Sequence, residues 1–240
     1  MVKNRFWDLD RKTIKIKICG IKTIDVAYNA YLLGADALGF HLWSWDDENI
    51  YEYKIKTFRT LLSFLPSDIS NFLLTDIKDH KTILSILRNI PEIDTLQIQG
   101  EITLKELEKI CRFLKTEIPN LYIVKTIPPR EDELTFCLRD LEKIVDGIVI
   151  DSGWYGGSGK PHNWYESAKI ATKLTKPVIL AGGLNFKNVK DAIKIVHPYG
   201  VDVESGVEDV LLNHSGNKTK VKNFIKIRKF IKSIKGGCDD

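Results

Sequence analysis

Short runs of β-branched residues alternate with longer amphipathic stretches along the whole chain, and this alternation most restricts the possible folds. The expected strands are residues 13–19, 37–41, 71–74, 95–98, 121–125, 147–150, 177–180 and 200–203. The expected helices are residues 23–33, 55–65, 81–89, 104–115, 133–144, 164–174, 188–196 and 221–234. Strict alternation of this kind predicts a parallel sheet covered by helices.

Eight strand-helix units in 240 residues favour closure of this α/β sheet into a (β/α)8 TIM barrel. No segment rich in Pro, Gly or Ser divides the chain, so residues 1–240 are expected to form a single domain. A short N-terminal extension is expected to cover the barrel floor or an interface. The alternative is an open doubly wound sheet, which favours a GxGxxG turn after the first strand, where this chain reads CGIKT.

The composition argues against several other classes of protein. Apolar residues make up 43% of the chain and charged residues 28%, with 36 Lys+Arg against 32 Asp+Glu. No apolar run reaches the roughly 18 residues that span a bilayer, and the charged first residues do not form a secretory signal. A cytoplasmic chain without nucleic-acid or membrane partners is therefore expected. The basic segment 218–235 is interpreted as the last barrel helix rather than as a nucleic-acid or membrane segment.

The four cysteines lie far apart in the sequence, at Cys19, Cys111, Cys137 and Cys238. Their spacing predicts neither a disulfide framework nor a metal site, and no cofactor is expected. Cys111 and Cys137 fall in expected helices and Cys238 in the tail. Cys19 ends the first strand, and barrel enzymes carry their catalytic groups at the C-terminal ends of the strands. The alternative is a buried structural thiol.

Lys17 lies two residues before Cys19 on the same face of the expected strand, about 6–7 Å away. The isoleucines that alternate with these residues are expected to face the helices, which directs Lys17 and Cys19 into the barrel. A nearby cation favours the thiolate form of a cysteine. In a closed barrel the eighth strand lies beside the first, so Asp202 is the expected carboxylate partner of the lysine.

The sixth strand ends at Asp151, which is followed by a segment rich in glycine. Gly156, Gly157 and Gly159 belong to this segment, and we expect it to close over a bound substrate. A carboxylate at the end of a buried apolar strand is a candidate catalytic group. The alternative is an aspartate that caps a turn.

Small residues follow the last two strands. Gly182 and Gly183 come after the seventh strand, and Ser205 and Gly206 after the eighth. Backbone N–H groups in such loops can approach an anion, and barrels commonly bind phosphate at this place. The alternative is that these glycines only permit tight turns.

At these positions the sequence resembles the phosphoribosylanthranilate isomerase family. The resemblance extends over roughly residues 15–208 and is carried by KICGIKTIDVAYNAYLLGADALGF, DSGWYGGSGKPHNW, LAGGLNFKNVKDAI and HPYGVDVESGVED. It implies a (β/α)8 isomerase of tryptophan biosynthesis that converts an aminoaldose phosphate to an aminoketose phosphate, an Amadori rearrangement. It also implies a phosphorylated small molecule as the partner, no cofactor, and a monomer or homodimer.

The resemblance implies roles for individual residues. Asp151 would be the general acid that opens the furanose ring, and Cys19 the general base that removes the C2 proton. Asp202 matches a ligand-binding aspartate of the family. The loops implied to bind the phosphate contain Gly182, Gly183, Ser205 and Gly206.

Three positions depart from the family pattern. An arginine that pairs with the anthranilate carboxylate is usual after the second strand, and its place falls at Glu48, beside Asp46 and Asp47. An acidic loop there predicts repulsion of the carboxylate. Gln99 stands where the family tends to show a histidine, and Glu204 where a serine is usual.

These departures leave two alternatives open: a related barrel that acts on another sugar phosphate, and a relative that binds a phosphate ligand without turnover. The loop after the second strand also carries aromatic residues that either stack on a substrate ring or pack on the barrel rim. These are Trp43, Trp45, Tyr51 and Tyr53.

Overall fold

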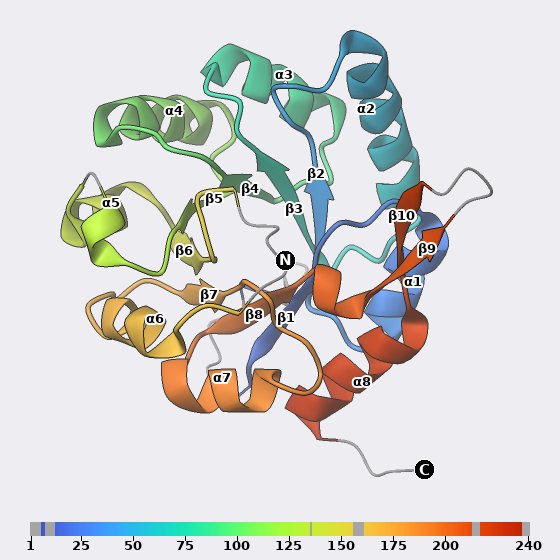
Figure 1. The fold of residues 1–240 in the computed structure, drawn as a ribbon. Coiled ribbons are helices and arrows are strands. Elements are labelled where there is room, and N and C mark those ends of the chain that lie inside the picture. Colours follow the sequence, from blue (N-terminus) through green and yellow to red (C-terminus); the bar gives the residue numbers. More distant parts are fainter. Residues whose placement is uncertain (1–5, 8–12, 135, 156–160, 213–216, 237–240) are drawn as a thin grey trace.

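The computed structural model describes residues 6–7, 13–134, 136–155, 161–212 and 217–236. Eight parallel strands close into a barrel in sequence order, with β8 beside β1, and helices surround the ring (Figure 1). The strands are β1 (Lys15–Ile18), β2 (Ala37–His41), β3 (Ser70–Thr75), β4 (Thr95–Ile98), β5 (Tyr122–Ile127), β6 (Gly147–Ile150), β7 (Val178–Leu180) and β8 (Gly200–Val203). The predicted (β/α)8 barrel is confirmed, and the open sheet is excluded.

Eight α-helices alternate with these strands within the described residues. They are α1 (Ile24–Leu32), α2 (Glu48–Leu62), α3 (His80–Asn89), α4 (Leu104–Glu117), α5 (Leu138–Ile144), α6 (Trp164–Ala171), α7 (Val189–Val196) and α8 (Phe224–Lys235). Two 3-10 turns, η1 (Glu131–Glu133) and η2 (Ser205–Val207), lie in the loops. In the part of the chain that is described, no helix is long and apolar enough to cross a membrane.

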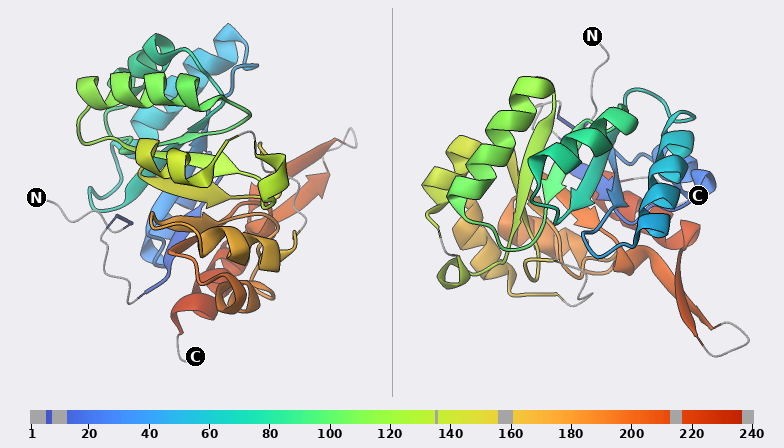
Figure 2. Two further views of the ribbon diagram at one scale, coloured as in Figure 1. Left: turned by 90° about the vertical axis from the view of Figure 1, so that its left-hand side faces the viewer. Right: turned by 90° about the horizontal axis from the view of Figure 1, so that it is seen from above.

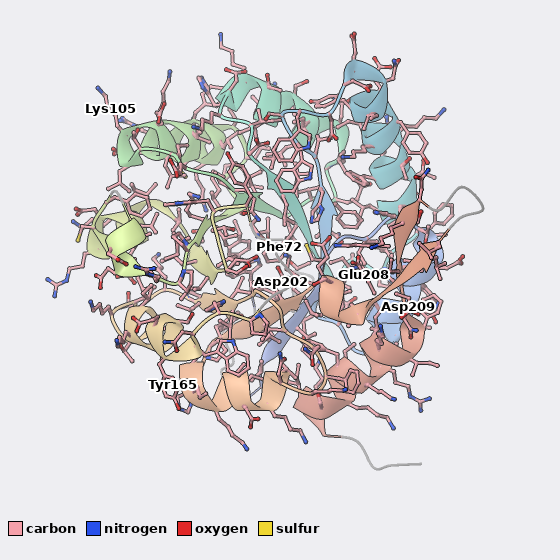
Figure 3. All side chains as sticks on the ribbon, in the orientation of Figure 1. Phe72, Lys105, Tyr165, Asp202, Glu208 and Asp209 are labelled. Atoms are coloured by element: carbon pink, nitrogen blue, oxygen red, sulfur yellow. The ribbon has the colours of Figure 1, made fainter. Side chains whose placement is uncertain are left out.

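The strands bury their two faces in two separate apolar layers. Ile16 and Ile18 belong to the layer between strands and helices, as the alternation of β1 predicts. Cys19 and Phe72 belong to the layer inside the barrel. Figure 3 shows Phe72 near the middle of the strand ring. Successive side chains along each strand therefore point alternately into the barrel and into the helix layer.

Phe6 and Trp7, the described part of the N-terminal extension, close the floor of the barrel. The Phe6 ring packs edge-on against Phe72, with ring centroids 5.1 Å apart. Trp7 stacks on Tyr122 at 4.5 Å and donates from Nε1 to the Thr95 hydroxyl at 2.8 Å. Phe6 and Trp7 thus cover the barrel floor, the first of the two positions expected for the extension.

Two segments differ most from the sequence-based expectation. Residues 218–222 form β10 (Lys218–Lys222), which pairs antiparallel with β9 (Glu208–Leu212) and includes the first two residues of the helix expected over 221–234. This hairpin projects from the barrel body (Figure 2). The run KTKVK alternates in polarity with a period of two, which fits a strand better than a helix.

The other difference concerns α2, which begins at Glu48, seven residues before the expected start. Asp47 caps its first turn, and Asp47 Oδ1 accepts a hydrogen bond from the Ile50 N–H at 2.9 Å. Much of this first part is exposed, so it lacks the apolar spacing that marks a helix in the sequence.

Candidate active site

A pocket opens at the C-terminal ends of the strands, the end at which barrel enzymes build their sites. Cys19 after β1, Asp151 after β6 and Asp202 on β8 all line it. Gly182, Gly183 and Ser205 line it from the loops after β7 and β8. Six of the predicted site residues therefore surround one cavity.

Lys17 and Asp202 form a buried ion pair at the base of this pocket. Lys17 Nζ lies 2.6 Å from Asp202 Oδ2, and it donates to Gln97 Oε1 at 3.0 Å. Burial alone would lower the pKa of Lys17, but the Asp202 carboxylate outweighs this effect and the pKa is raised. The predicted partnership is confirmed, and Lys17 remains a cation at neutral pH.

Cys19 is surrounded by ionisable groups. The ammonium of Lys17 lies 3.5 Å from Cys19 Sγ, and His41 Nε2 lies 3.2 Å from it. His41 Nε2 is also 3.5 Å from Glu204 Oε2. Burial raises the pKa of the Cys19 thiol well above its usual range, and the Lys17 charge opposes this shift. Burial lowers the pKa of His41, so its imidazole is neutral at neutral pH.

Asp151 occupies a different environment on the β6 side of the pocket. Its Oδ1 accepts hydrogen bonds from the Ser152 N–H at 2.6 Å and the Ser152 hydroxyl at 3.0 Å. Burial raises the pKa of Asp151 to about 6, although the bonds from Ser152 act in the opposite direction. A carboxyl group with this pKa exchanges protons near neutral pH, which suits a general acid.

The loops after β7 and β8 approach each other closely. A Cβ atom at Gly206 would lie 1.9 Å from the Leu184 carbonyl oxygen, so only glycine permits this contact. Gly182 and Gly183 adopt positive φ values of 85° and 65°. Within the described residues, the N–H groups of Gly182, Gly183 and Ser205 donate no hydrogen bond. Free N–H groups on adjacent loops can bind an anion.

Not every predicted site residue is part of this geometry. Gly156, Gly157 and Gly159 lie outside the described residues, and Gly206 supports the pocket without lining it. Cys137, expected within a helix, precedes α5 and is exposed.

The acidic residues after β2 do not line the pocket. Glu48 is exposed in the first turn of α2, and Asp47 caps that turn. Asp46 pairs with Lys54 at 2.6 Å. The prediction that Glu48 repels the anthranilate carboxylate in the site is therefore wrong, because helix capping and ion pairing hold these acidic residues outside the pocket lining.

Aromatic and amide side chains complete the pocket wall. Trp43 and Tyr155 line it, and Trp45 stacks on the outer side of Trp43 with ring centroids 5.0 Å apart. Gln99 also lines it, and its Oε1 is buried without a hydrogen-bond partner in the described structure. The remaining aromatic residues of the segment lie away from the pocket: Tyr51 packs on the helix layer, and Tyr53 is exposed.

Lys220 reaches the pocket from β10. It is the one lysine or arginine among the described lining residues, and it forms no ion pair with any of them. His41 and Lys220 were missed in the sequence. His41 ends β2, so the rule that selected Cys19 and Asp151 also indicates His41. Lys220 reaches the pocket only because its segment forms the second strand of the hairpin, and that segment was interpreted as part of the last helix.

The fold and the pocket together define the class of protein. A closed (β/α)8 barrel with ionisable side chains and free backbone N–H groups converging at its C-terminal face is a barrel enzyme. The family model of N-(5'phosphoribosyl)anthranilate (PRA) isomerase matches residues 16–232, and the chain belongs to this family.

Individual relatives agree with this assignment. N-(5'-phosphoribosyl)anthranilate isomerase of Methanothrix thermoacetophila is 32% identical over 218 residues, which cover 88% of this chain and 96% of the relative. The phosphoribosyl anthranilate isomerase structure from Thermus thermophilus has a TM-score of 0.70 at 23% identity, covering 92% of this chain and 98% of that one. A further isomerase structure, in complex with reduced 1-(o-carboxyphenylamino)-1-deoxyribulose 5-phosphate, has a TM-score of 0.67 at 24% identity. The match covers 93% of this chain and 100% of that one.

Proposed function

We propose that this chain isomerises N-(5'-phosphoribosyl)anthranilate in tryptophan biosynthesis, the activity for which its family is named. The observation that carries the proposal is that Cys19 and Asp151, from strands that are not neighbours, line one pocket beside two loops with free N–H groups. The phosphorylated ligand in the related structure supports a substrate of this class. In this proposal the chain's residues transfer only protons.

Asp151 acts first, as the general acid. Its pKa of about 6 leaves a protonated fraction at neutral pH, and this proton passes to the ring oxygen of the ribose. The bond between C1 and the ring oxygen then breaks, and the nitrogen lone pair forms a C1=N iminium. The aspartate becomes ionised as the ring opens.

Cys19 acts second, as the general base. Its thiolate removes the proton from C2, the C–H electron pair becomes a C1=C2 double bond, and the iminium nitrogen regains its lone pair. The enol then tautomerises to the C2 ketone. Because burial favours the thiol, Cys19 must first lose its proton, and His41 Nε2 at 3.2 Å is placed to accept it. The neighbouring Lys17 ammonium stabilises the thiolate.

Other pocket groups bind the substrate. The N–H groups of Gly182, Gly183 and Ser205 bind the phosphate. Asp202 Oδ1 and Gln99 Oε1 are buried acceptors without partners within the described chain, and both residues line the pocket. Such acceptors are costly when left unpaired, so we assign them to hydroxyl groups of the sugar.

Lys220 binds the anthranilate carboxylate. Three of the lining residues are carboxylates, Asp151, Asp202 and Glu204, so an anionic substrate needs a cation at the mouth. Lys220 supplies this charge from the hairpin, on a different segment from the usual arginine after the second strand. The aromatic ring would then lie between Lys220 and the wall formed by Trp43.

Replacing the two proton-transfer groups tests the proposed reaction. We expect Cys19→Ala and Asp151→Asn each to lower kcat by about 10²–10⁴-fold, measured with enzymatically generated phosphoribosylanthranilate. Cys111→Ala, which removes a buried thiol of α4, and Asp140→Asn on α5 are the matched controls and should retain activity. An inactive wild-type chain, or full activity in both site variants, would exclude this function. Wild-type activity should also rescue growth of a tryptophan auxotroph lacking the isomerase.

The role of Lys220 is tested separately. We expect Lys220→Ala to raise the KM for phosphoribosylanthranilate about tenfold, the effect of losing one charged hydrogen bond. Lys218→Ala, two residues away on the same strand but outside the pocket lining, should leave KM unchanged. An analogue without the carboxylate should be converted equally by the wild type and Lys220→Ala. If the wild type prefers that analogue, the chain acts on another sugar phosphate.

A further inference from the structure

We infer that Cys19, His41 and Glu204 form a binding site for a zinc-type transition-metal ion, and that metal bound there inhibits the enzyme. The three residues follow or end β1, β2 and β8, which are neighbours in the closed barrel. Their ligand atoms, one sulfur, one nitrogen and one oxygen, all lie within 4.8 Å of one another. The inhibition rests on the proposed function, whereas the binding does not.

The spacing of the ligand atoms fits a tetrahedral ion. Cys19 Sγ and His41 Nε2 are 3.2 Å apart, and His41 Nε2 and Glu204 Oε2 are 3.5 Å apart. With metal–sulfur and metal–nitrogen bonds of about 2.3 and 2.0 Å, tetrahedral ligands are separated by about 3.3–3.6 Å. Small side-chain movements therefore bring all three atoms to one ion.

No placement of hydrogen atoms lets His41 hydrogen-bond to both the thiol and the carboxylate of this cluster. His41 Nε2 faces both a thiol and a carboxylate, and a neutral imidazole nitrogen either donates one hydrogen or accepts one. If it donates to Glu204, it presents no lone pair to the thiol, and if it accepts from the thiol, its lone pair faces the carboxylate. A metal cation attracts all three groups at once.

The surrounding charges favour the cation. Asp202 neutralises Lys17, so the nearest ammonium does not leave an excess of positive charge beside the sulfur. His41 Nε2 already points toward the thiol and the carboxylate, so its lone pair can bind the same ion as they do. The ion replaces the Cys19 proton, and Lys17 Nζ at 3.5 Å can donate a hydrogen bond to the bound thiolate.

The donor set selects the class of metal. One thiolate, one imidazole and one carboxylate suit Zn²⁺ and its relatives, whereas Mg²⁺ and Ca²⁺ prefer oxygen ligands alone. Because all three residues line the pocket, a fourth position faces the substrate space. Bound metal removes the thiolate from proton transfer and lies where substrate must bind, so we expect inhibition that chelators reverse.

Binding is tested on the full chain without reference to activity. The probe is Co²⁺, which shows a near-ultraviolet charge-transfer band when bound to thiolate. The background carries Cys137→Ser and Cys238→Ser, which remove an exposed thiol and a tail thiol. We expect one Co²⁺ per chain, no band in Cys19→Ser, and binding at least about tenfold weaker in His41→Val and in Glu204→Ser. The matched control is His197→Asn, an exposed histidine after α7, which should bind normally.

Inhibition is measured in parallel. Zn²⁺ should displace Co²⁺ and inhibit turnover over the same concentration range, and EDTA should restore activity. Absence of the band, or equal metal affinity in wild type, His41→Val and Glu204→Ser, would overturn the site. Turnover measured in EDTA tests the proposed function by itself, so an inactive enzyme that binds Co²⁺ through Cys19 contradicts only that function.

Discussion

The barrel wall fully buries one described lysine on each of its two sides. Lys17 on β1 points into the barrel, where it contacts Asp202, Gln97 and Cys19. Lys125 on β5 lies on the opposite face of the barrel wall and points toward the helix layer. The side chains of both lysines are fully buried, yet only Lys17 has a carboxylate within ion-pair distance in the described structure.

Lys125 is held by backbone carbonyl groups instead. Its Nζ donates to Gly100 O at 2.7 Å and Thr126 O at 2.6 Å, and it lies 5.0 Å from the centre of the Trp154 ring. Burial lowers the pKa of Lys125 to about 7, and repulsion from Lys78 adds to the shift.

The difference between the two sites is a counter-charge. Asp202 overcomes the effect of burial at Lys17, whose pKa is raised, whereas carbonyl dipoles do not overcome it at Lys125. Lys17 is therefore a permanent cation beside Cys19, and Lys125 gains or loses its proton near neutral pH. Stability measurements can separate the two sites.

The largest expected effect follows removal of the ammonium from the ion pair. We expect Lys17→Met to lower the free energy of unfolding by about 3–5 kcal/mol, because Asp202 is left buried and uncompensated. Urea denaturation at neutral pH measures this loss. The double variant Lys17→Met/Asp202→Leu should regain most of it, since an apolar pair replaces both charges. A change below about 1 kcal/mol in Lys17→Met would show that the pair is not desolvated.

The sequence predicted this ion pair because strand parity and barrel closure suffice to place it. Cys19, Asp151 and the loops after β7 and β8 were found in the same way, from the order of strands and the rule that sites lie at strand ends. This reasoning needs no side-chain geometry. It placed four strands at their observed bounds, and the other strand limits differ by no more than two residues.

What the sequence did not predict depends on contacts between distant segments. Glu204 turns toward His41 only because β8 and β2 both flank β1, and a spacing search for metal ligands does not detect residues so far apart. Lys220 reaches the pocket through a hairpin whose basic residues resembled the start of a helix. The acidic residues near Glu48 were assigned to the site because helix capping was not considered.

A smaller effect, dependent on pH, is expected at Lys125. Between about pH 7 and 10 the unfolded chain holds a proton on this residue that the folded chain has lost, so the contribution of Lys125 to stability rises with pH. The slope approaches about 1.4 kcal/mol per pH unit, and it vanishes below about pH 7, where both states are protonated. Lys125→Met should remove this contribution, whereas the Lys17 contribution is constant over the same range. Urea denaturation of both chains across this range measures the difference.

The control for Lys125 is Lys115, a half-exposed lysine of α4 that pairs with Asp146 at 2.6 Å. Lys115→Met should leave the pH dependence of stability unchanged between about pH 7 and 10. Parallel curves for the wild type and Lys125→Met would contradict the inferred neutral form of Lys125.

The smallest effect concerns the ring over Lys125. Trp154→Leu removes a cation–π contact that stabilises only the charged lysine, by about 0.5–1 kcal/mol. The pKa of Lys125 should therefore fall further, and the contribution of Lys125 to stability should begin to rise at a lower pH. Lost packing lowers stability equally at every pH. A shift of the stability curve along the pH axis therefore reports only the loss of the cation–π contact. The Lys125 Cε chemical shift, followed by NMR titration, reports the pKa directly. An unchanged midpoint would show that the carbonyl groups alone stabilise the buried ammonium and that the ring does not.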